Sequence, residues 1–419
     1  MSTLDVRTRT EAAVRGVDPR TFFDDELPSL AADRSHHAVP AAMELRMSPF
    51  CIATPSGAWT VSIRGDRVCV DSGDAGDARV ELDDDEVGKL VDDLITPMTL
   101  VASARLRMVR GNLGDFLDWW VVLRALIDGR DAHTAGSVQF HDRDGAPLDF
   151  GRRFGPDDDD AEIAHFLCEA GFLHLEGWFD EGEMEQISRD VDAALPRYTP
   201  DDGRSWWAEI ADGTQRAVRL QRFEEHSAAL ASLLLDERFL RIGRLTDDGY
   251  VARTTAEALE KPIGVVKGIS DLLWHKDCSL GMHSYTCSGL TVGVSVTGAD
   301  ESSGQLSVVP GSHRALVQPA LHRTTWGLPP RDLPTCTGDL TVHCSCTLHM
   351  SHPPVARERR VVYTGFGLPT GDTVAAEHQA AVSDVREHAY KKVSQDPSPV
   401  ATRQSPAGSP ASARASRSA

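Results

Sequence analysis

The feature that most constrains the fold lies in the second half of the chain, where short alternating segments replace helical periodicity. From residue 265 onward, apolar residues recur at every second position in segments that are separated by turn residues such as Gly338-Asp339. Short strands at regular spacing are typical of β-sandwiches and barrels. We therefore predict an all-β core with helices packed outside it, with strands at 291–296, 306–309, 340–348 and 360–364.

Composition and patterning divide the 419 residues into several parts, as expected for a chain of this length. The segment before 160 holds four consecutive Asp residues, and the end of the chain alternates Ser, Pro, Ala and Arg without apolar periodicity. We predict an irregular N-terminus at 1–36, an α+β domain at 37–150, an acidic linker at 151–160, a mainly β domain at 161–392 and a disordered tail at 393–419.

Local signals support both folded regions. In the first, two alternating segments flank Gly65-Asp66, which predicts a hairpin. A third strand at 79–82 and helices at 83–93 and 113–127 complete an α+β layer. In the second, we expect a helix that Asp160 caps and Gly171 ends, followed by a strand and by a capping box formed by Asp180 and Glu183.

Charge and cysteine content exclude several classes of function. The chain has 43 basic and 63 acidic residues, a net charge of −20, and such a surface repels phosphate backbones. We therefore expect no nucleic-acid partner. No apolar run approaches the roughly 20 residues of a membrane span. Eight scattered cysteines without a secretory leader predict a cytoplasmic protein with free thiols. Zinc binding by Cys336, Cys344 and Cys346 is a weak alternative, because no Cys-X-X-Cys is present.

A candidate metal site lies within the predicted β core, in the run Trp274-His275-Lys276-Asp277. Side chains two apart on a strand point to the same face, so His275 and Asp277 can bind one ion together. On the segment 340–348 and just beyond it, His343 and His349 share one face by the same rule, and either can supply a third ligand. Two histidines and one carboxylate form a facial triad, which leaves coordination positions open and suits non-haem Fe(II) oxygenases.

Four ordered motifs then show a resemblance to the phytanoyl-CoA dioxygenase family over residues 160–370. They are GFLHLEG at 171–177, GQLSVVPGSHR at 304–314, the segment from Gly338-Asp339 to His349-Met350-Ser351, and Arg359-Arg360 before an apolar strand. The resemblance implies a double-stranded β-helix, which is a jelly-roll or cupin-like fold. It also implies Fe(II) as cofactor, with 2-oxoglutarate and dioxygen as co-substrates.

Site residues carry over from the family one at a time. His275 and Asp277 match the proximal metal ligands and His349 the distal ligand, with His343 as its rival. Arg360 and Ser351 match the residues that bind the distal carboxylate of 2-oxoglutarate, with Arg359 as the alternative to Arg360. Lys267 resembles a family position near the other carboxylate.

The sequence departs from the family after the distal histidine, where Met350-Ser351-His352 replaces the usual Gly and Asn, so substrate contacts can differ there. Asp277 is retained, which favours hydroxylation over halogenation.

The N-terminal domain resembles sterol-carrier-protein-2-like domains through GAWTV at 57–61, GDRV at 65–68 and RGNLGD at 110–115. That resemblance implies an apolar lipid tunnel between sheet and helices, and a filled α+β core is the alternative.

Together the two resemblances imply hydroxylation of a lipophilic natural-product intermediate of terpenoid, polyketide or fatty-acyl type, possibly a CoA thioester, with release of succinate and CO2. Two alternatives stay open: a lipid carrier with an inactive oxygenase core, and the same cofactor chemistry ending in desaturation or rearrangement.

Overall fold

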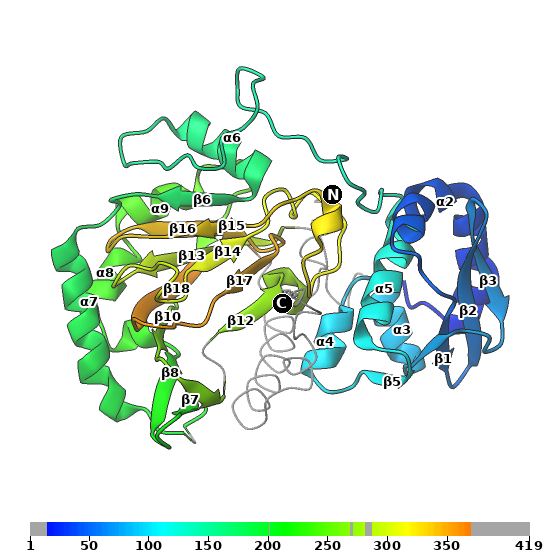
Figure 1. Ribbon diagram of the computed structural model, residues 1–419, viewed down its shortest axis with the longest axis horizontal. Coiled ribbons are helices and arrows are strands. Elements are labelled where there is room, and N and C mark those ends of the chain that lie inside the picture. The colour runs from blue at the N-terminus through cyan, green and yellow to red at the C-terminus, as the bar shows by residue number, and fades with distance from the viewer. Residues whose placement is uncertain (1–14, 201, 269–270, 281–286, 370–419) are drawn as a thin grey trace, which may run out of the picture.

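The computed structural model describes residues 15–200, 202–268, 271–280 and 287–369. They form two domains that lie side by side, with the N-terminal domain in blue and cyan in Figure 1. The predicted tail at 393–419 and the first 14 residues of the predicted irregular N-terminus lie outside the described residues. No helix in the described ranges is long and apolar enough to cross a bilayer.

A five-stranded sheet forms the base of the N-terminal domain, in the order β3-β2-β1-β4-β5. The predicted hairpin is confirmed: β2 and β3 pair across Gly65, whose positive φ suits the turn. The predicted strand at 79–82 is also present, as β4, and it pairs in parallel with β1. The strands are β1 (Phe50–Thr54), β2 (Gly57–Arg64), β3 (Arg67–Ser72), β4 (Ala78–Glu81) and β5 (Arg107–Arg110).

Helices pack on this sheet, and their first members correct a prediction. Residues 15–36 are not irregular: helical structure runs from Pro19 to Glu44, and it buries Phe22, Phe23 and Leu27. The sequence did not predict this helix, because its buried stripe is made largely of alanine and because it contains Pro40. The helices are α1 (Pro19–Thr21), η3 (Phe22–Glu26), α2 (Leu27–Glu44), α3 (Asp84–Val91), α4 (Pro97–Ala102) and α5 (Leu113–Asp128).

The C-terminal domain is built from two antiparallel sheets, as expected for a jelly roll. The larger sheet has nine strands, and the smaller has the order β12-β17-β14-β15. The larger comprises β11 (Val265–Lys267), β7 (Ser205–Ile210), β8 (Gln215–Leu220), β10 (Glu257–Lys261), β18 (Arg359–Gly367), β13 (Gly289–Ser295), β16 (Leu340–Cys344) and β6 (Phe172–Leu175) in that order, with β9 (Val251–Ala252) beside β18. The smaller comprises β12 (Leu272–His275), β14 (Leu306–Val308), β15 (Arg331–Leu333) and β17 (His349–Ser351).

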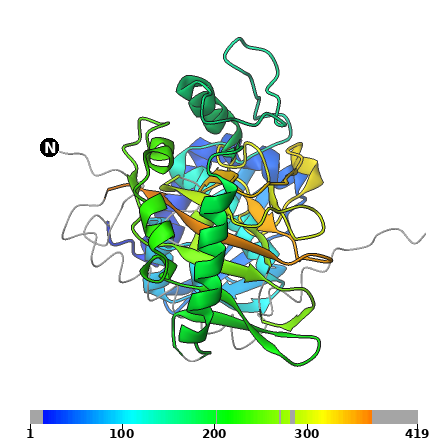
Figure 2. The ribbon, with the colours of Figure 1, turned by 90° about the vertical axis from the view of Figure 1, so that its left-hand side faces the viewer.

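Helices cover the outer face of the larger sheet, where α7 crosses the strands (Figure 2). The strand residues on this face are apolar and buried, for example Val292, Val342 and Val362, and they share one core with the helices. The helical segments of this domain are α6 (Asp160–Ala170), α7 (Glu181–Ala194), η4 (Leu195–Arg197), η5 (Phe223–Glu225), α8 (Ala228–Leu233), α9 (Glu237–Gly243), η6 (Asp277–Leu280) and η7 (Thr324–Trp326). The opposite, inner face of the sheet is left for polar side chains.

Three local predictions need correction in this domain. The segment 340–348 is not one strand: β16 ends at Cys344, a turn follows, and β17 begins at His349 in the other sheet. The acidic linker is not wholly solvated, because Phe154 is buried in the core. Asp159, and not Asp160, caps α6. The helix end at Gly171 and the capping box at the start of α7 are as predicted.

The two domains meet along the loop that follows β14. Asp118 of α5 accepts hydrogen bonds from Gln318 and Arg323, each at 2.8 Å. Ala132 forms a parallel bridge with Leu316. A second contact joins Thr96, the N-cap of α4, to the carbonyl of Ser279 in η6. The N-terminal domain therefore contacts both the loop and the turn that begins at Asp277.

Candidate metal centre

Pairing between β12 and β17 places two histidines side by side. His275 and His349 are cross-strand partners in this ladder, and their ring centroids are 4.1 Å apart. The chain then leaves β12, so Asp277 is the first residue of η6 and not part of the strand. Its Oδ1 lies 3.5 Å from His275 Nε2 and 3.7 Å from His349 Nε2. The ligand atoms of the three residues lie within 4.8 Å of one another, which is compatible with one shared ion.

Backbone carbonyls fix the orientation of both imidazoles. Nδ1 of His275 lies 2.7 Å from the carbonyl oxygen of Leu273, and Nδ1 of His349 lies 3.0 Å from that of Thr347. Each Nδ1 therefore carries the proton and donates it, which leaves each Nε2 as a free lone pair directed at Asp277. Histidines that bind metals usually donate their other ring N–H in this way, which fixes the tautomer and the orientation of the ring.

The electrostatics of the triad also favour a metal. Burial would raise the pKa of Asp277, but the three neighbouring histidines, His349 first, hold it well below its usual value. Burial, then the charges of His343 and His275, hold the pKa of His349 well below its usual value. The site thus presents an ionised carboxylate beside a neutral imidazole, which are the protonation states that metal binding requires. The Asp277 side chain keeps 32% of its surface exposed, so the site is open on one side.

The rival ligand, His343, is also present at the site. It is buried on the inner face of β16, and its Nε2 lies 3.4 Å from Asp277 Oδ2. The parity argument that placed it beside His349 assumed one continuous strand and was wrong. The two side chains converge because the two sheets face each other. Only His275, Asp277 and His349 form a group with metal-ligand spacing in the described part of the chain.

A pair of buried cations lies next to the triad. Lys261 of β10 and Arg359 of β18 are cross-strand partners, and both donate to Ser351 Oγ of β17, Arg359 at 3.1 Å. Lys261 also donates to the carbonyl of His352 at 2.9 Å. Burial, and then the charge of Arg359, lower the pKa of Lys261 to about 6. Nε of Arg359 has no hydrogen-bond partner among the described residues.

Arg360 lies on the other face of β18, which corrects its predicted role. Its guanidinium donates to Ser188 and Asp192 of α7 and forms an ion pair with Glu260 at 2.5 Å. It therefore belongs to the packing between α7 and the sheet, and Arg359, the alternative, is the arginine beside Ser351. The other predicted cation, Lys267, is exposed on the edge strand β11 opposite Glu209, and no ion pair or hydrogen bond among the described residues joins it to the triad.

Two further residues of the site were missed from sequence. Lys261 is the last residue of its strand and is followed by Pro262, so it matches no sequence motif. The only sequence pattern that could have pointed to it is the alternation that places Glu257, Leu259 and Lys261 on one face of the strand. Thr291 donates to Asp277 Oδ2 at 2.7 Å from the neighbouring strand β13. Pairing across strands, which sequence does not specify, brings both residues to the triad.

The zinc alternative finds no support in the described residues. Cys336 is exposed, whereas Cys344 and Cys346 are buried. These cysteines are not part of a group with metal-ligand spacing in the described ranges. All eight cysteines of the chain have free thiols, as predicted.

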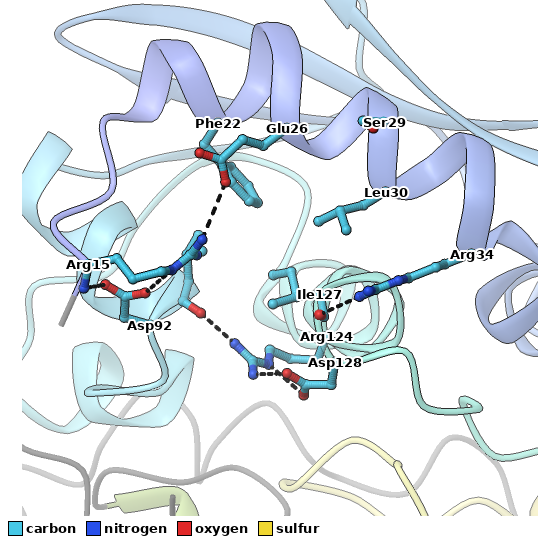
Figure 3. Close-up of a pocket in the computed structure, with 11 residues that line it drawn as sticks. Arg15, Phe22, Glu26, Ser29, Leu30, Arg34, Asp92, Arg124, Ile127 and Asp128 are labelled. Atoms are coloured by element: carbon cyan, nitrogen blue, oxygen red, sulfur yellow. Dashed lines mark hydrogen bonds and ion pairs between the residues drawn. The ribbon is translucent and has the colours of Figure 1, made fainter. Parts of the chain in front are cut away.

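The N-terminal domain has a pocket of about 480 Å³, but it is not an apolar tunnel (Figure 3). It lies between α2, the end of α3 and α5, and charged side chains dominate its wall. These residues pair with one another: Arg15 contacts Glu26 and Asp92, and Arg124 contacts Asp128. The space between sheet and helices is instead filled by side chains such as Trp59, Phe116 and Trp119. This matches the filled-core alternative.

Comparison with known proteins gives a family match within the C-terminal domain. Residues 167–361 match the sequence model of the family described as phytanoyl-CoA dioxygenase (PhyH). This segment is therefore similar to PhyH domains. It contains the triad, Lys261, Ser351 and both candidate arginines. No curated protein sequence matches the chain.

Several solved structures are similar to about half of the chain. The epimerase SnoN in complex with Fe3+, alpha ketoglutarate and nogalamycin RO is 17% identical, with a TM-score of 0.41 over 49% of this chain and 82% of that one. AviO1 from Streptomyces viridochromogenes Tue57 is 18% identical, with a TM-score of 0.41 over 52% and 98%. The alpha ketoglutarate dependent carbocyclase SnoK from nogalamycin biosynthesis is 21% identical, with a TM-score of 0.40 over 52% and 87%.

Proposed function

We propose that this protein is an Fe(II)- and 2-oxoglutarate-dependent dioxygenase that hydroxylates an unactivated C–H bond of a lipophilic small molecule. The observation that carries the proposal is that two features lie together around strand β17, which holds both His349 and Ser351. A two-histidine, one-carboxylate triad lies beside two buried cations, Lys261 and Arg359, that meet at Ser351 Oγ. A metal alone does not explain the cations, and a dicarboxylate co-substrate explains both.

The residues fit both groups. His275, Asp277 and His349 would hold Fe(II) as a facial triad, which leaves positions for a chelating keto acid and dioxygen. Arg359 would bind the distal carboxylate of 2-oxoglutarate through its planar fork, whose Nε has no other partner in the described residues. When bound, the iron and 2-oxoglutarate supply the oxidising power for C–H cleavage, with succinate and CO2 as co-products.

The protein's own groups would orient the reactants and keep the site dry. Ser351 receives hydrogen bonds from both cations, so its hydroxyl proton is free to be donated to a carboxylate. Lys261, protonated in the complex, would neutralise that carboxylate further. The buried position of both cations strengthens these interactions relative to water.

The inner face of the larger sheet provides the substrate wall. By strand register, Tyr363, Leu259 and Glu257 share the face of Lys261 and Arg359. Arg219 pairs with Glu257 and stacks at 4.4 Å over Trp206. This mixed wall favours a largely apolar substrate that also carries polar groups, such as an oxygenated terpenoid or polyketide. Free thiols at all eight cysteines favour a reducing compartment, in line with a cytoplasmic natural-product enzyme.

The test is release of succinate from 2-oxoglutarate by protein reconstituted anaerobically with Fe(II), then given dioxygen and a library of lipophilic small molecules. We expect turnover to be lost in Asp277→Ala and His349→Ala and kept in His165→Ala, a histidine on α6 remote from the triad. Substrate mass then separates hydroxylation (+16) from desaturation (−2). Failure to hold stoichiometric iron after anaerobic reconstitution would favour the carrier alternative.

A further inference from the structure

His343 is a buried titratable group that the proposed chemistry does not use. It lies in β16 opposite Thr291 of β13, and only 1% of its surface is exposed. Its ring is 4.1 Å from that of His349. Neither ring nitrogen has a hydrogen-bond partner among the described residues. A buried polar group without a partner costs about 1–3 kcal/mol, so its position at the triad calls for an explanation.

The two oxygens of Asp277 face different neighbours. Oδ1 faces Nε2 of His275 and of His349, at 3.5 and 3.7 Å. Oδ2 accepts a hydrogen bond from Thr291 Oγ1 at 2.7 Å and lies 3.4 Å from His343 Nε2. One oxygen is therefore turned toward the candidate metal position, and the other toward two potential donors on the larger sheet.

We propose that His343 is a positioning residue for the metal site. In the metal-bound protein its Nε2–H, now 3.4 Å from Oδ2 of Asp277, donates to that oxygen together with the Thr291 hydroxyl, so that only Oδ1 is presented to the metal. This inference rests on the proposed metal site. A carboxylate held by one oxygen occupies one coordination position instead of two, which keeps the remaining positions available for co-substrate and dioxygen.

The geometry argues for positioning over direct ligation. The ligand atoms of His275, Asp277 and His349 lie within 4.8 Å of one another, and His343 is not a member of this set. Its Nε2 faces Oδ2 of Asp277, which also accepts the hydrogen bond from Thr291, whereas Oδ1 faces the other two imidazoles. Residues that orient metal ligands in this way typically contribute 10- to 100-fold to metal affinity.

Four single variants test the role through Co(II) affinity and the visible spectrum of bound Co(II), neither of which depends on turnover. His343→Phe keeps the volume and removes the donor, and we expect Co(II) to bind about 10- to 100-fold more weakly. His343→Gln places an amide N–H near the former Nε2 and should restore most of the affinity. Thr291→Val should also weaken Co(II) binding. Its control is Thr364→Val, which removes a buried hydroxyl away from the triad, one that donates to the carbonyl of Thr255.

The double variant sharpens the test. Because His343 and Thr291 hold the same oxygen, the effects of His343→Phe and Thr291→Val on Co(II) affinity should not add.

Unchanged Co(II) affinity and spectrum in His343→Phe would overturn the inference and leave the proposed function standing. A His343→Gln variant as weak as His343→Phe, with a spectrum showing one ligand fewer, would overturn it in favour of direct ligation. Failure of the wild-type protein to bind Co(II) would instead reject the proposed metal site. Thermal unfolding of the metal-free variants verifies that each is folded. If His343→Phe is not folded, His343→Leu, which also removes the donor, takes its place with the same expected loss of affinity.

Discussion

Arg359 and Arg360 are adjacent in the chain, yet their substitution should have opposite consequences. Arg359 lies on the inner face of β18 and donates to Ser351 Oγ, whereas Arg360 faces α7 and pairs with Asp192 and with the buried Glu260. Replacing each by Met keeps the aliphatic part of the side chain and removes the guanidinium. We predict that Arg359→Met weakens 2-oxoglutarate binding and that Arg360→Met weakens folding.

The magnitudes follow from the contacts. Hydrogen bonds to charged groups contribute about 1.5–3 kcal/mol each, so loss of a bidentate guanidinium costs about 3 kcal/mol. At 1.4 kcal/mol per tenfold, this corresponds to a 100- to 200-fold weaker Kd for 2-oxoglutarate. Lys261 remains beside Ser351, so some affinity should survive. Arg360→Met leaves Glu260 buried with Arg216 as its remaining cation, at 3.9 Å, and should lower the free energy of unfolding by about 2 kcal/mol.

The assay is calorimetric titration of 2-oxoglutarate into protein loaded with Zn(II), which has no redox chemistry and so does not consume the ligand. Urea unfolding of the same samples gives the stability change. Arg360→Met should bind 2-oxoglutarate within about twofold of wild type, and Arg359→Met should unfold near the wild-type midpoint. The reverse pattern, with 2-oxoglutarate binding lost in Arg360→Met and kept in Arg359→Met, would refute the assignment of faces on β18.

Three further predictions follow from the same contacts. The pKa of Lys261 is lowered to about 6 by burial and by Arg359, so binding of a carboxylate beside it should take up a proton above that pH. The affinity for 2-oxoglutarate should then fall as the pH rises from 6 to 8, by at most tenfold per unit, and Lys261→Met should flatten this dependence in the same titration. Asp277→Asn keeps the shape but removes the charge of the carboxylate, and should abolish stoichiometric Fe(II) binding in equilibrium dialysis while the fold persists by circular dichroism. Asp118→Ala removes the acceptor of Gln318 and Arg323 between the domains and should lower the free energy of urea unfolding by about 1–3 kcal/mol, while Asp144→Ala, in an exposed turn, should not.

Sequence patterns predicted the elements that local chemistry specifies. The hairpin at Gly65, the left-handed helix end at Gly171 and the capping box of Asp180 and Glu183 all depend on a few neighbouring residues, and all are present. The helix from Leu27 to Glu44 was missed because alanine in its buried stripe gives no amphipathic signal. Its stability comes from tertiary packing against α5 and the sheet, which no local pattern encodes.

The candidate site shows the same division between local and non-local information. The resemblance picked His275, Asp277 and His349, which the structure brings within ligand spacing. Alternation along a strand tells which residues share a face, but it does not tell which face is inner. Arg359 and Arg360 were therefore indistinguishable until pairing of β18 with β10 placed Lys261 opposite Arg359 and Glu260 opposite Arg360.

The same register explains how one strand serves both packing and chemistry. On the outer face of β18 and β10, Arg360 and Glu260 neutralise each other beneath α7, so their burial needs no ligand. On the inner face, Lys261 and Arg359 lie side by side and both donate to the hydroxyl of Ser351. Because burial and the charge of Arg359 lower the pKa of Lys261 to about 6, Arg359 carries most of the charge of this pair at neutral pH. A buried charge raises the free energy of the folded protein unless an anion pairs with it. A dicarboxylate bound there would pair with Arg359 and favour the protonated form of Lys261, and it would stabilise the fold as it completes the site.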